Sequence, residues 1–184
     1  MKCEKLNFGE YSVKNVKEFQ GMEGNGFNAD LYRGKKKVAF CIDEGCGGEV
    51  MIHWADRDIG KRDEKEFVIV QKSVEKEVFY AYLKSLPQFA NEFTESMLSV
   101  DATWFVGELV EEVALERERK KIAKKLSTKT MFTDGTKTWE VNSPYNEIFE
   151  AKIRAQYEAK GKKGTLTFLN TLPIEEAFRI LNVA

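Results

Sequence analysis

Alternating apolar and polar residues dominate the first third of the chain, and a period of two predicts β-strands. The alternation covers residues 11–19, 27–32, 38–42 and 50–54. A turn at Gly34 joins the second and third segments. We therefore expect an antiparallel meander with one apolar face, which a helix or a second layer must cover. The residues expected on that face are Phe27, Ala29, Leu31, Val38, Phe40, Ile42, Val50, Ile52 and Trp54.

Apolar residues recur at intervals of three and four through the middle of the chain, which predicts helices. The first helix is expected over residues 61–86, before Pro87, although the β-branched run FVIV at 67–70 also fits a strand. The second is expected to begin at the N-cap residue Asp101 and to reach about Leu126. Its segment ERERKK, at 116–121, has no apolar residue to bury.

The last part of the chain predicts a small ββαβα unit. Residues 129–132 and 136–141 flank Asp134-Gly135, a good turn pair for a hairpin. Ser143-Pro144 fits the N-cap and first position of a helix that stops at Gly161. A strand over 165–169 and a closing helix over 173–181 follow.

These elements predict the α+β class. We expect an antiparallel β-meander over residues 1–60, a region of long helices over 61–128 and a small α+β unit over 129–184. A chain of 184 residues can bury roughly 70% of its unfolded surface. One compact domain or two closely packed lobes both fit this length.

Composition narrows the class of protein. The formal net charge of −1 gives the whole chain no field that attracts polyanions. No segment approaches the ~20 apolar residues of a membrane span, and the N-terminus lacks the apolar core of a signal peptide. Three cysteines are an odd number for a disulfide framework and predict reduced thiols. We expect a cytoplasmic protein that does not contact a membrane.

Cys3, Cys41, Cys46 and His53 are the residue types that bind zinc. Their positions in or beside alternating strands favour a packing role, in which buried thiols act as small apolar groups. His53 with Cys41 or Cys46 would also be a nucleophile and its base, but no third residue that would orient the pair is evident. We predict no metal site and no catalytic residue here.

Two glycine-rich segments suggest other chemistry. Carboxylates in and after the loop DEGCGGE, at 43–49, would suit Mg²⁺, although acids in glycine-rich loops more often form turns. The run GMEGNG at 21–26 resembles a phosphate-binding loop but precedes a strand instead of a helix. We predict no cofactor. The acids in question are Asp43, Glu44, Glu49, Asp56 and Asp58.

Charge is distributed unevenly along the second predicted helix. Residues 101–116 carry five acids and no base, whereas residues 117–130 carry seven bases and one acid. This order matches the helix dipole and fits a solvated helix end, but it also fits a contact surface for a partner. Lys160, Lys162 and Lys163 form a second basic spot. The residues predicted to bind a partner are Glu108, Glu111, Glu112, Arg117, Arg119, Lys120, Lys121, Lys124 and Lys125.

Several segments resemble a family of small accessory proteins carried by phages and mobile elements of gut-type bacteria. The matching segments, about half of the chain, are FQGMEGNGFNADLY (19–32), KKVAFCIDEGCGG (36–48), Trp54, KTMF (129–132) and NSPY (142–145). The resemblance implies an inhibitor of host defence, such as an anti-CRISPR protein that binds an RNA-guided nuclease. It implies no catalytic residue.

The sequence therefore favours a non-enzymatic protein that binds a host macromolecular machine. Tyr32, Trp139 and Tyr145 are candidate aromatic anchors, although each suits a position in the core better than one on the surface. Two alternatives remain open. One is a nucleic-acid-binding regulator that uses the basic helix 117–125, and the other is a metal-dependent hydrolase that uses the loop from Asp43 to Glu49.

Overall fold

The computed structural model describes residues 6–90, 97–161 and 164–183, and it has the α+β composition that the sequence predicts. The chain forms two compact units, Met1–Val113 and Ala114–Ala184, which we call unit 1 and unit 2. The boundary between the units falls inside one long helix, whereas the sequence pattern changes at residues 60 and 128. Each unit has buried apolar clusters of its own.

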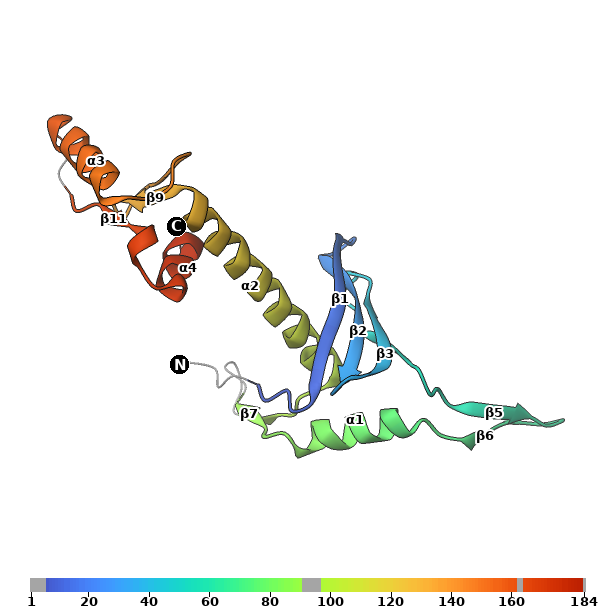
Figure 1. Cartoon of the computed structure of the whole chain (residues 1–184). Helices are drawn as coiled ribbons and strands as arrows, with labels where there is room; N and C mark the ends of the chain where they lie inside the picture. The colour runs from blue at the N-terminus through green and yellow to red at the C-terminus, as the bar shows by residue number, and fades with distance from the viewer. Residues whose placement is uncertain (1–5, 91–96, 162–163, 184) are drawn as a thin grey trace. The chain divides into compact units, whose positions relative to one another are not determined.

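Unit 1 contains the antiparallel meander (Figure 1). Its strands pair in chain order and are β1 (Tyr11–Gln20), β2 (Asn25–Arg33), β3 (Lys36–Asp43) and β4 (Met51–Trp54). Gly34, between β2 and β3, has a φ of +60°, a left-handed conformation that glycine adopts without strain. The predicted meander is confirmed.

A β-bulge changes which side chains of β3 face the core. The register between β2 and β3 shifts at Val38, which is one extra residue in β3. An extra residue reverses the alternation that follows it. The buried side chains beyond the bulge are therefore those of Ala39 and Cys41. The prediction that Phe40 and Ile42 face the core is wrong, and both are half-buried.

Residues 61–73 do not form the first part of a helix. They belong largely to a hairpin of β5 (Ile59–Arg62) and β6 (Phe67–Gln71), and the helix α1 (Val74–Ser85) begins after it. The β-branched residues of β6 favour extended backbone. Asp63 closes the turn by accepting hydrogen bonds from the N–H groups of Lys65 and Glu66. The prediction of one helix over 61–86 is wrong up to residue 73 and correct over α1.

Helix α1 and the first part of helix α2 (Ala102–Thr128) cover the apolar face of the meander. Phe79 of α1 and Phe105 of α2 are fully buried, and their ring centroids lie 5.6 Å apart with an edge-to-face orientation. Tyr11 of β1 packs against both rings. The helix predicted from Asp101 is confirmed, because the Asp101 carboxylate accepts the N–H of Trp104 at 2.7 Å. A short pair, β7 (Phe89–Ala90) and β8 (Met97–Leu98), lies between the helices in the sequence.

Unit 2 contains the rest of α2 and a small sheet with strand order β10-β9-β11. Its further elements are β9 (Thr130–Thr133), β10 (Thr138–Val141), α3 (Glu147–Ala159), β11 (Thr167–Phe168), η1 (Leu169–Thr171) and α4 (Ile174–Val183). The predicted hairpin is confirmed, and Asp134 holds its turn by accepting the N–H of Lys137. The N-cap predicted at Ser143 is wrong. Asn146 caps α3 instead, since its side chain accepts the N–H of Phe149.

The two faces of this sheet pack on different helices. Phe132 of β9 lies in a cluster with Ile153 and Tyr157 of α3. Met131, the residue before it on the same strand, packs against Ala177 of α4 and Leu126 of α2. Alternation along β9 therefore places α3 on one face and α4 on the other. No helix in the described part of the chain combines the length and the apolar composition needed to cross a bilayer.

Candidate functional site

The residue types that bind zinc do not converge in the described part of the chain. Cys41 faces the core of unit 1, and burial raises the pKa of its thiol to about 12. His53 of β4 lies opposite Phe40 of β3, so its side chain is on the other face of the sheet from that of Cys41. Cys46 is exposed in the loop that follows β3, and Cys3 lies outside the described residues. Among the residues described, no group of three or more His, Cys, Asp or Glu side chains is arranged to hold a metal ion.

The carboxylates considered as magnesium ligands lie in two separate places, the loop after β3 and the N-terminus of α1, and those described below form structural hydrogen bonds there. Asp43 accepts the N–H of Gly45 at 2.8 Å within the glycine-rich loop. Asp56 and Asp58 instead lie at the start of α1, where Asp56 accepts the Ser73 hydroxyl and Asp58 accepts the Ser73 N–H. Each of these three carboxylates therefore has a local structural role.

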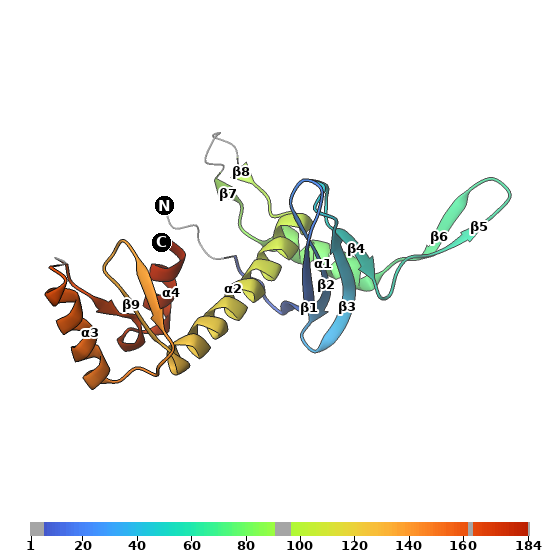
Figure 2. The same ribbon diagram turned by 90° about the horizontal axis from the view of Figure 1, so that it is seen from above.

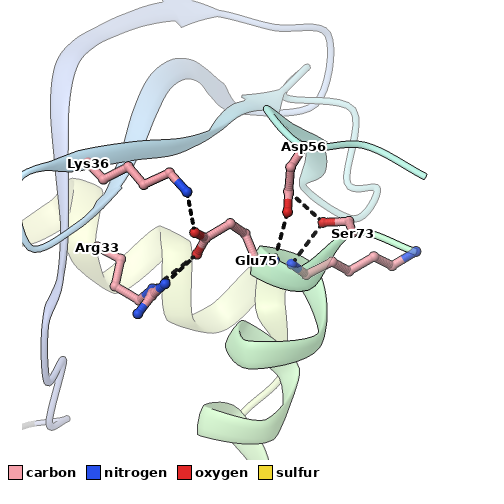
Figure 3. Close-up of polar contacts among 6 residues, drawn as sticks. Arg33, Lys36, Asp56, Ser73 and Glu75 are labelled. Carbon is pink, nitrogen blue, oxygen red and sulfur yellow. Dashed lines mark hydrogen bonds and ion pairs between the residues drawn. The ribbon is translucent and has the colours of Figure 1, made fainter. Parts of the chain in front are cut away.

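A charge network around the buried Glu75 fixes the N-terminus of α1 against the meander (Figure 3). Glu75, whose side chain is 5% exposed, accepts hydrogen bonds from Lys36 at 2.6 Å and from Arg33 at 2.9 Å. The Lys36 hydrogen bond is the largest of the effects that lower the pKa of Glu75. Beside it, Asp56 accepts the N–H of Glu75 and the hydroxyl of Ser73. These bonds outweigh the effect of burial and lower the pKa of Asp56. The network satisfies its charges internally and so stabilises the fold.

The two glycine-rich loops pack against each other at one end of the meander. The N–H of Glu23 donates to the carbonyl of Gly45, and the N–H of Gly21 donates to the carbonyl of Gly24. A Cβ at Gly21 would lie 2.5 Å from the Glu44 carbonyl oxygen, so only glycine allows this approach. Amides of a phosphate-binding loop point at the ligand, whereas these two are bonded to carbonyls. The loop GMEGNG thus serves the tight packing of the meander.

All nine residues predicted to bind a partner lie on α2, but the units divide them. Glu108, Glu111 and Glu112 belong to unit 1, and Glu108 accepts a hydrogen bond from the indole of Trp104. The basic residues belong to unit 2. Acids pair with several of them: Arg119 with Glu175, Lys120 with Glu116, Lys121 with Glu118 and Lys125 with Glu140.

These ion pairs reduce the charge that the basic segment presents to solvent. Two of the acids, Glu116 and Glu118, lie on α2 itself, four and three residues from the lysines that they pair with, which is the usual spacing for ion pairs along a helix. The other two acids, Glu140 of β10 and Glu175 of α4, are distant in sequence and reach the segment only through the fold. Glu140 also pairs with Lys129, and this lowers the pKa of Glu140.

The two units carry opposite charge. Unit 1 contains 21 acidic and 15 basic residues, a formal net charge of −6. Unit 2 contains 9 acidic and 14 basic residues, a formal net charge of +5. The near-neutral total of −1 conceals this division.

A groove of about 370 Å³ lies in unit 2, between the β9–β10 hairpin and α3. Aromatic and aliphatic side chains form most of its lining, and Trp139 stacks on Phe132 with ring centroids 5.4 Å apart. Lys152, Gln156 and Lys160 lie along one rim at intervals of four residues. We call this feature the aromatic groove. Its lining is Phe132, Trp139, Val141, Phe149, Lys152, Ile153, Gln156, Tyr157 and Lys160.

The sequence does not predict the aromatic groove, although some of the residues that form it are conspicuous. Trp139, one of the three candidate anchors, is half-buried and lines the groove. Tyr145 instead bonds Glu150 through its hydroxyl, and Tyr32 lies under the ammonium group of Lys14. The lysines at 152 and 160 share one face of a predicted helix, and that spacing was the available clue.

Scans of the chain against protein-family models, curated proteins and solved structures found no match. The residues of the chain itself therefore carry the case for its function.

Proposed function

We propose that this chain is a non-enzymatic binding protein that engages a host ribonucleoprotein, with unit 2 in contact with RNA. The partner class implied by the family resemblance is a CRISPR nuclease, which the protein would inhibit inside the host bacterial cell. The observation that carries the proposal is the opposite charge of the two units, −6 and +5. A ribonucleoprotein offers both an RNA phosphate backbone and basic protein surfaces, so it complements both units.

The aromatic groove supplies the RNA contact in this proposal. Single-stranded nucleic acid binds where bases stack on aromatic side chains and phosphates meet basic ones. Trp139 offers the aromatic surface, and Lys152 and Lys160 offer the charge. Lys152 lies within α3 and Lys160 is its C-cap, so the helical rise separates the two by about 12 Å, a span that reaches more than one phosphate of a nucleic-acid strand. The volume of about 370 Å³ lies within the range of pockets that hold small ligands.

Unit 1 supplies the contact with protein. Its net charge of −6 suits a basic surface, such as the face with which a nuclease holds its own guide or target. Glu108, Glu111 and Glu112 stay the predicted residues of this contact. Electrostatic complementarity sets mainly the rate of association and the choice of partner.

The alternative of a nucleic-acid-binding regulator uses the same basic unit but another surface, the segment 117–125 of α2. Several bases of that segment already pair with acids of unit 2. Fewer of them are therefore available to neutralise phosphates, so binding of nucleic acid there would release fewer counterions and be weaker. Paired variants with the same change of charge distinguish the two surfaces. One is K152E/K160E in the aromatic groove, and the other is K120E/K124E on α2.

The experiment measures fluorescence anisotropy of a labelled 12-nucleotide single-stranded RNA at several salt concentrations. We expect weak binding by the wild type and a loss of about tenfold or more in W139A and in K152E/K160E. The charge variant should also reduce the slope of log K against log salt by about one to two. K120E/K124E should retain most of the binding. Loss of binding in K120E/K124E alone would favour the regulator and overturn the groove assignment.

A further inference from the structure

The β5–β6 hairpin of unit 1 exposes an apolar surface that the fold does not cover. Every residue from 61 to 71 is exposed, and Phe67 is 62% exposed. Figures 1 and 2 show the hairpin apart from the β1–β4 sheet in both views. An isolated two-stranded hairpin is only marginally stable, and exposed apolar patches commonly mark interaction surfaces. The exposed apolar residues are Ile59, Phe67, Val68, Ile69 and Val70.

The free edge of β6 is suited to pairing. In the described part of the chain β6 pairs with β5 alone, so its other edge presents unpaired backbone groups. The strand FVIVQ carries no charge, whereas protected edges usually carry lysine, proline or inward-pointing charges. Its one protective feature is a β-bulge at Val70, the residue left unpaired between the Gly60–Ile69 and Ile59–Gln71 pairs, so the regular edge runs from Phe67 to Ile69.

The hairpin itself is well constructed. The ring of Phe67 lies over Gly60, where a Cβ would come within 2.0 Å of a ring atom. Gly60 pairs with Ile69 and lies diagonally across from Phe67, so the absence of a Cβ leaves room for that ring to pack across the two strands. Phe67 thus holds the two strands together and leaves the outer edge of β6 open.

We propose that two copies of the chain form a symmetric dimer through antiparallel pairing of β6 with β6. A two-fold axis at Ile69 pairs this residue with its counterpart in the second copy, and the bulged Val70 of each copy then lies beside Val68 of the other. The same register places Glu66 opposite Lys72 of the second copy. The symmetry repeats that ion pair, so the interface carries two of them. The product is a four-stranded sheet across both copies.

Neighbouring registers are less favourable. An axis at Val68 sets Glu66 opposite Val70, and an axis at Val70 sets Lys72 opposite Val68. Each of these leaves charged residues against apolar ones and shortens the apolar overlap. An axis at Val68 also sets Glu64 opposite Lys72, but Glu64 lies in the hairpin turn, so only the axis at Ile69 places the ion pair directly beside both ends of the strand.

A second charge complementarity supports the same arrangement. A groove of about 420 Å³ at the base of the hairpin is lined by Ile69, Lys72, Lys76, Tyr80 and Lys84, together with Asp58 and Glu77 among others. The turn at the hairpin tip, DEKE at 63–66, carries three acids and one base. Antiparallel pairing directs the acidic tip of each copy toward the basic end of the strand, near Lys72, in the other.

The test is sedimentation equilibrium of the full chain from about 1 to 200 μM. A small interface of this kind predicts a dissociation constant in the micromolar range, so we expect twice the 21.1 kDa mass at high concentration. I69D should be monomeric throughout. Its unfolding temperature, measured by circular dichroism below 1 μM, should match the wild type because Ile69 is exposed.

Charge exchange tests the register. E66K and K72E should each weaken the dimer about tenfold or more, and E66K/K72E should restore it, because the double variant re-forms both ion pairs. K61E, on the strand away from the new edge, should leave dimerisation unchanged. A wild type that stays monomeric at 200 μM overturns the proposal, as does a dimer that I69D leaves intact. Failure of the double variant to recover overturns the register. RNA binding is measured separately at the aromatic groove, so the two proposals fail independently.

Discussion

The Glu75 carboxylate, on the first turn of α1, accepts hydrogen bonds from both Nε and Nη2 of Arg33, at the end of β2, at 3.0 and 2.9 Å. With Lys36 as its other partner, this carboxylate ties the helix to two strands of the meander. The exposed fraction of the Glu75 side chain is only 5%, so its charge depends on these partners.

Replacement of Glu75 by Gln should lower the free energy of unfolding by about 1–3 kcal/mol, because it removes the buried charge that Arg33 and Lys36 bind. Urea unfolding followed by circular dichroism measures this change. E77Q, in the same helical turn but exposed, is the matched control and should change stability little.

The effect of E75Q should depend on pH. The folded protein holds the pKa of Glu75 below its ordinary value, chiefly through the Lys36 hydrogen bond. The contribution of Glu75 to stability is therefore complete above the unfolded pKa of about 4.3 and is lost as pH falls through the folded pKa. The difference between wild type and E75Q should be constant from pH 7 to about pH 5.5 and should shrink below about pH 4. A difference that grows as pH falls would contradict this role.

Replacement of Tyr11 by Phe should leave stability unchanged or raise it by about 1 kcal/mol. The Tyr11 hydroxyl is buried, and no described residue hydrogen-bonds it. Burial is the main cause of its raised pKa. The ring, by contrast, packs against Phe79 and Phe105, so Tyr11→Ala should be strongly destabilising. Thermal unfolding of the two variants tests this contrast, and a clear loss in Tyr11→Phe would show that the hydroxyl has a partner.

Replacement of Gly26 by Ala should destabilise unit 1 by about 1–3 kcal/mol. A Cβ there would lie 2.5 Å from the Asp43 carbonyl oxygen, and backbone cannot move aside cheaply. Gly24, in the same loop, has open space around its Cβ position, so Gly24→Ala is the control. Urea unfolding of both variants should separate them. Equal stabilities would contradict the close packing of the two glycine-rich loops.

The thiols of Cys41 and Cys46 should react at very different rates. Cys41 is buried with a pKa raised to about 12, whereas Cys46 is exposed. In a C3S background, Ellman's reagent at pH 7.5 should therefore modify one thiol rapidly, and the second only after denaturant is added. C3S/C46S should lose the rapid phase. Rapid modification of that double variant would contradict the burial of Cys41.

The sequence predicts most of the fold where local pattern and tertiary packing agree. The strands of the meander and the hairpin around Asp134-Gly135 are of this kind. Val38 shows where prediction fails, since a bulge is a property of two paired strands and leaves no mark in the alternation of one. The run at 67–70 shows another limit, because β-branched residues there fit both periods until the turn at Asp63 is known.

The candidate site was less predictable than the fold. The basic residues of α2 are evident in the sequence, but two of their acidic partners come from β10 and α4. The aromatic groove joins Trp139 of one hairpin to Lys152 and Lys160 of a helix. These residues meet only because α3 packs on the same face of the sheet as Trp139, and the pattern of apolar residues along the chain does not predict which helix covers which face. The charge of each unit likewise emerges only when the boundary between them is known.

The most direct measurement of the proposed function is an affinity capture of the tagged full chain from lysate of a bacterium that carries a CRISPR nuclease. The RNA and the nuclease retained are quantified with and without ribonuclease, for the wild type and for K152E/K160E. We expect the wild type to retain both guide RNA and nuclease, and we expect the groove variant to retain several-fold less of each. Equal retention of the nuclease by both proteins, unchanged by ribonuclease, would contradict an RNA contact in the aromatic groove. Absence of the nuclease from every sample would contradict the proposed partner.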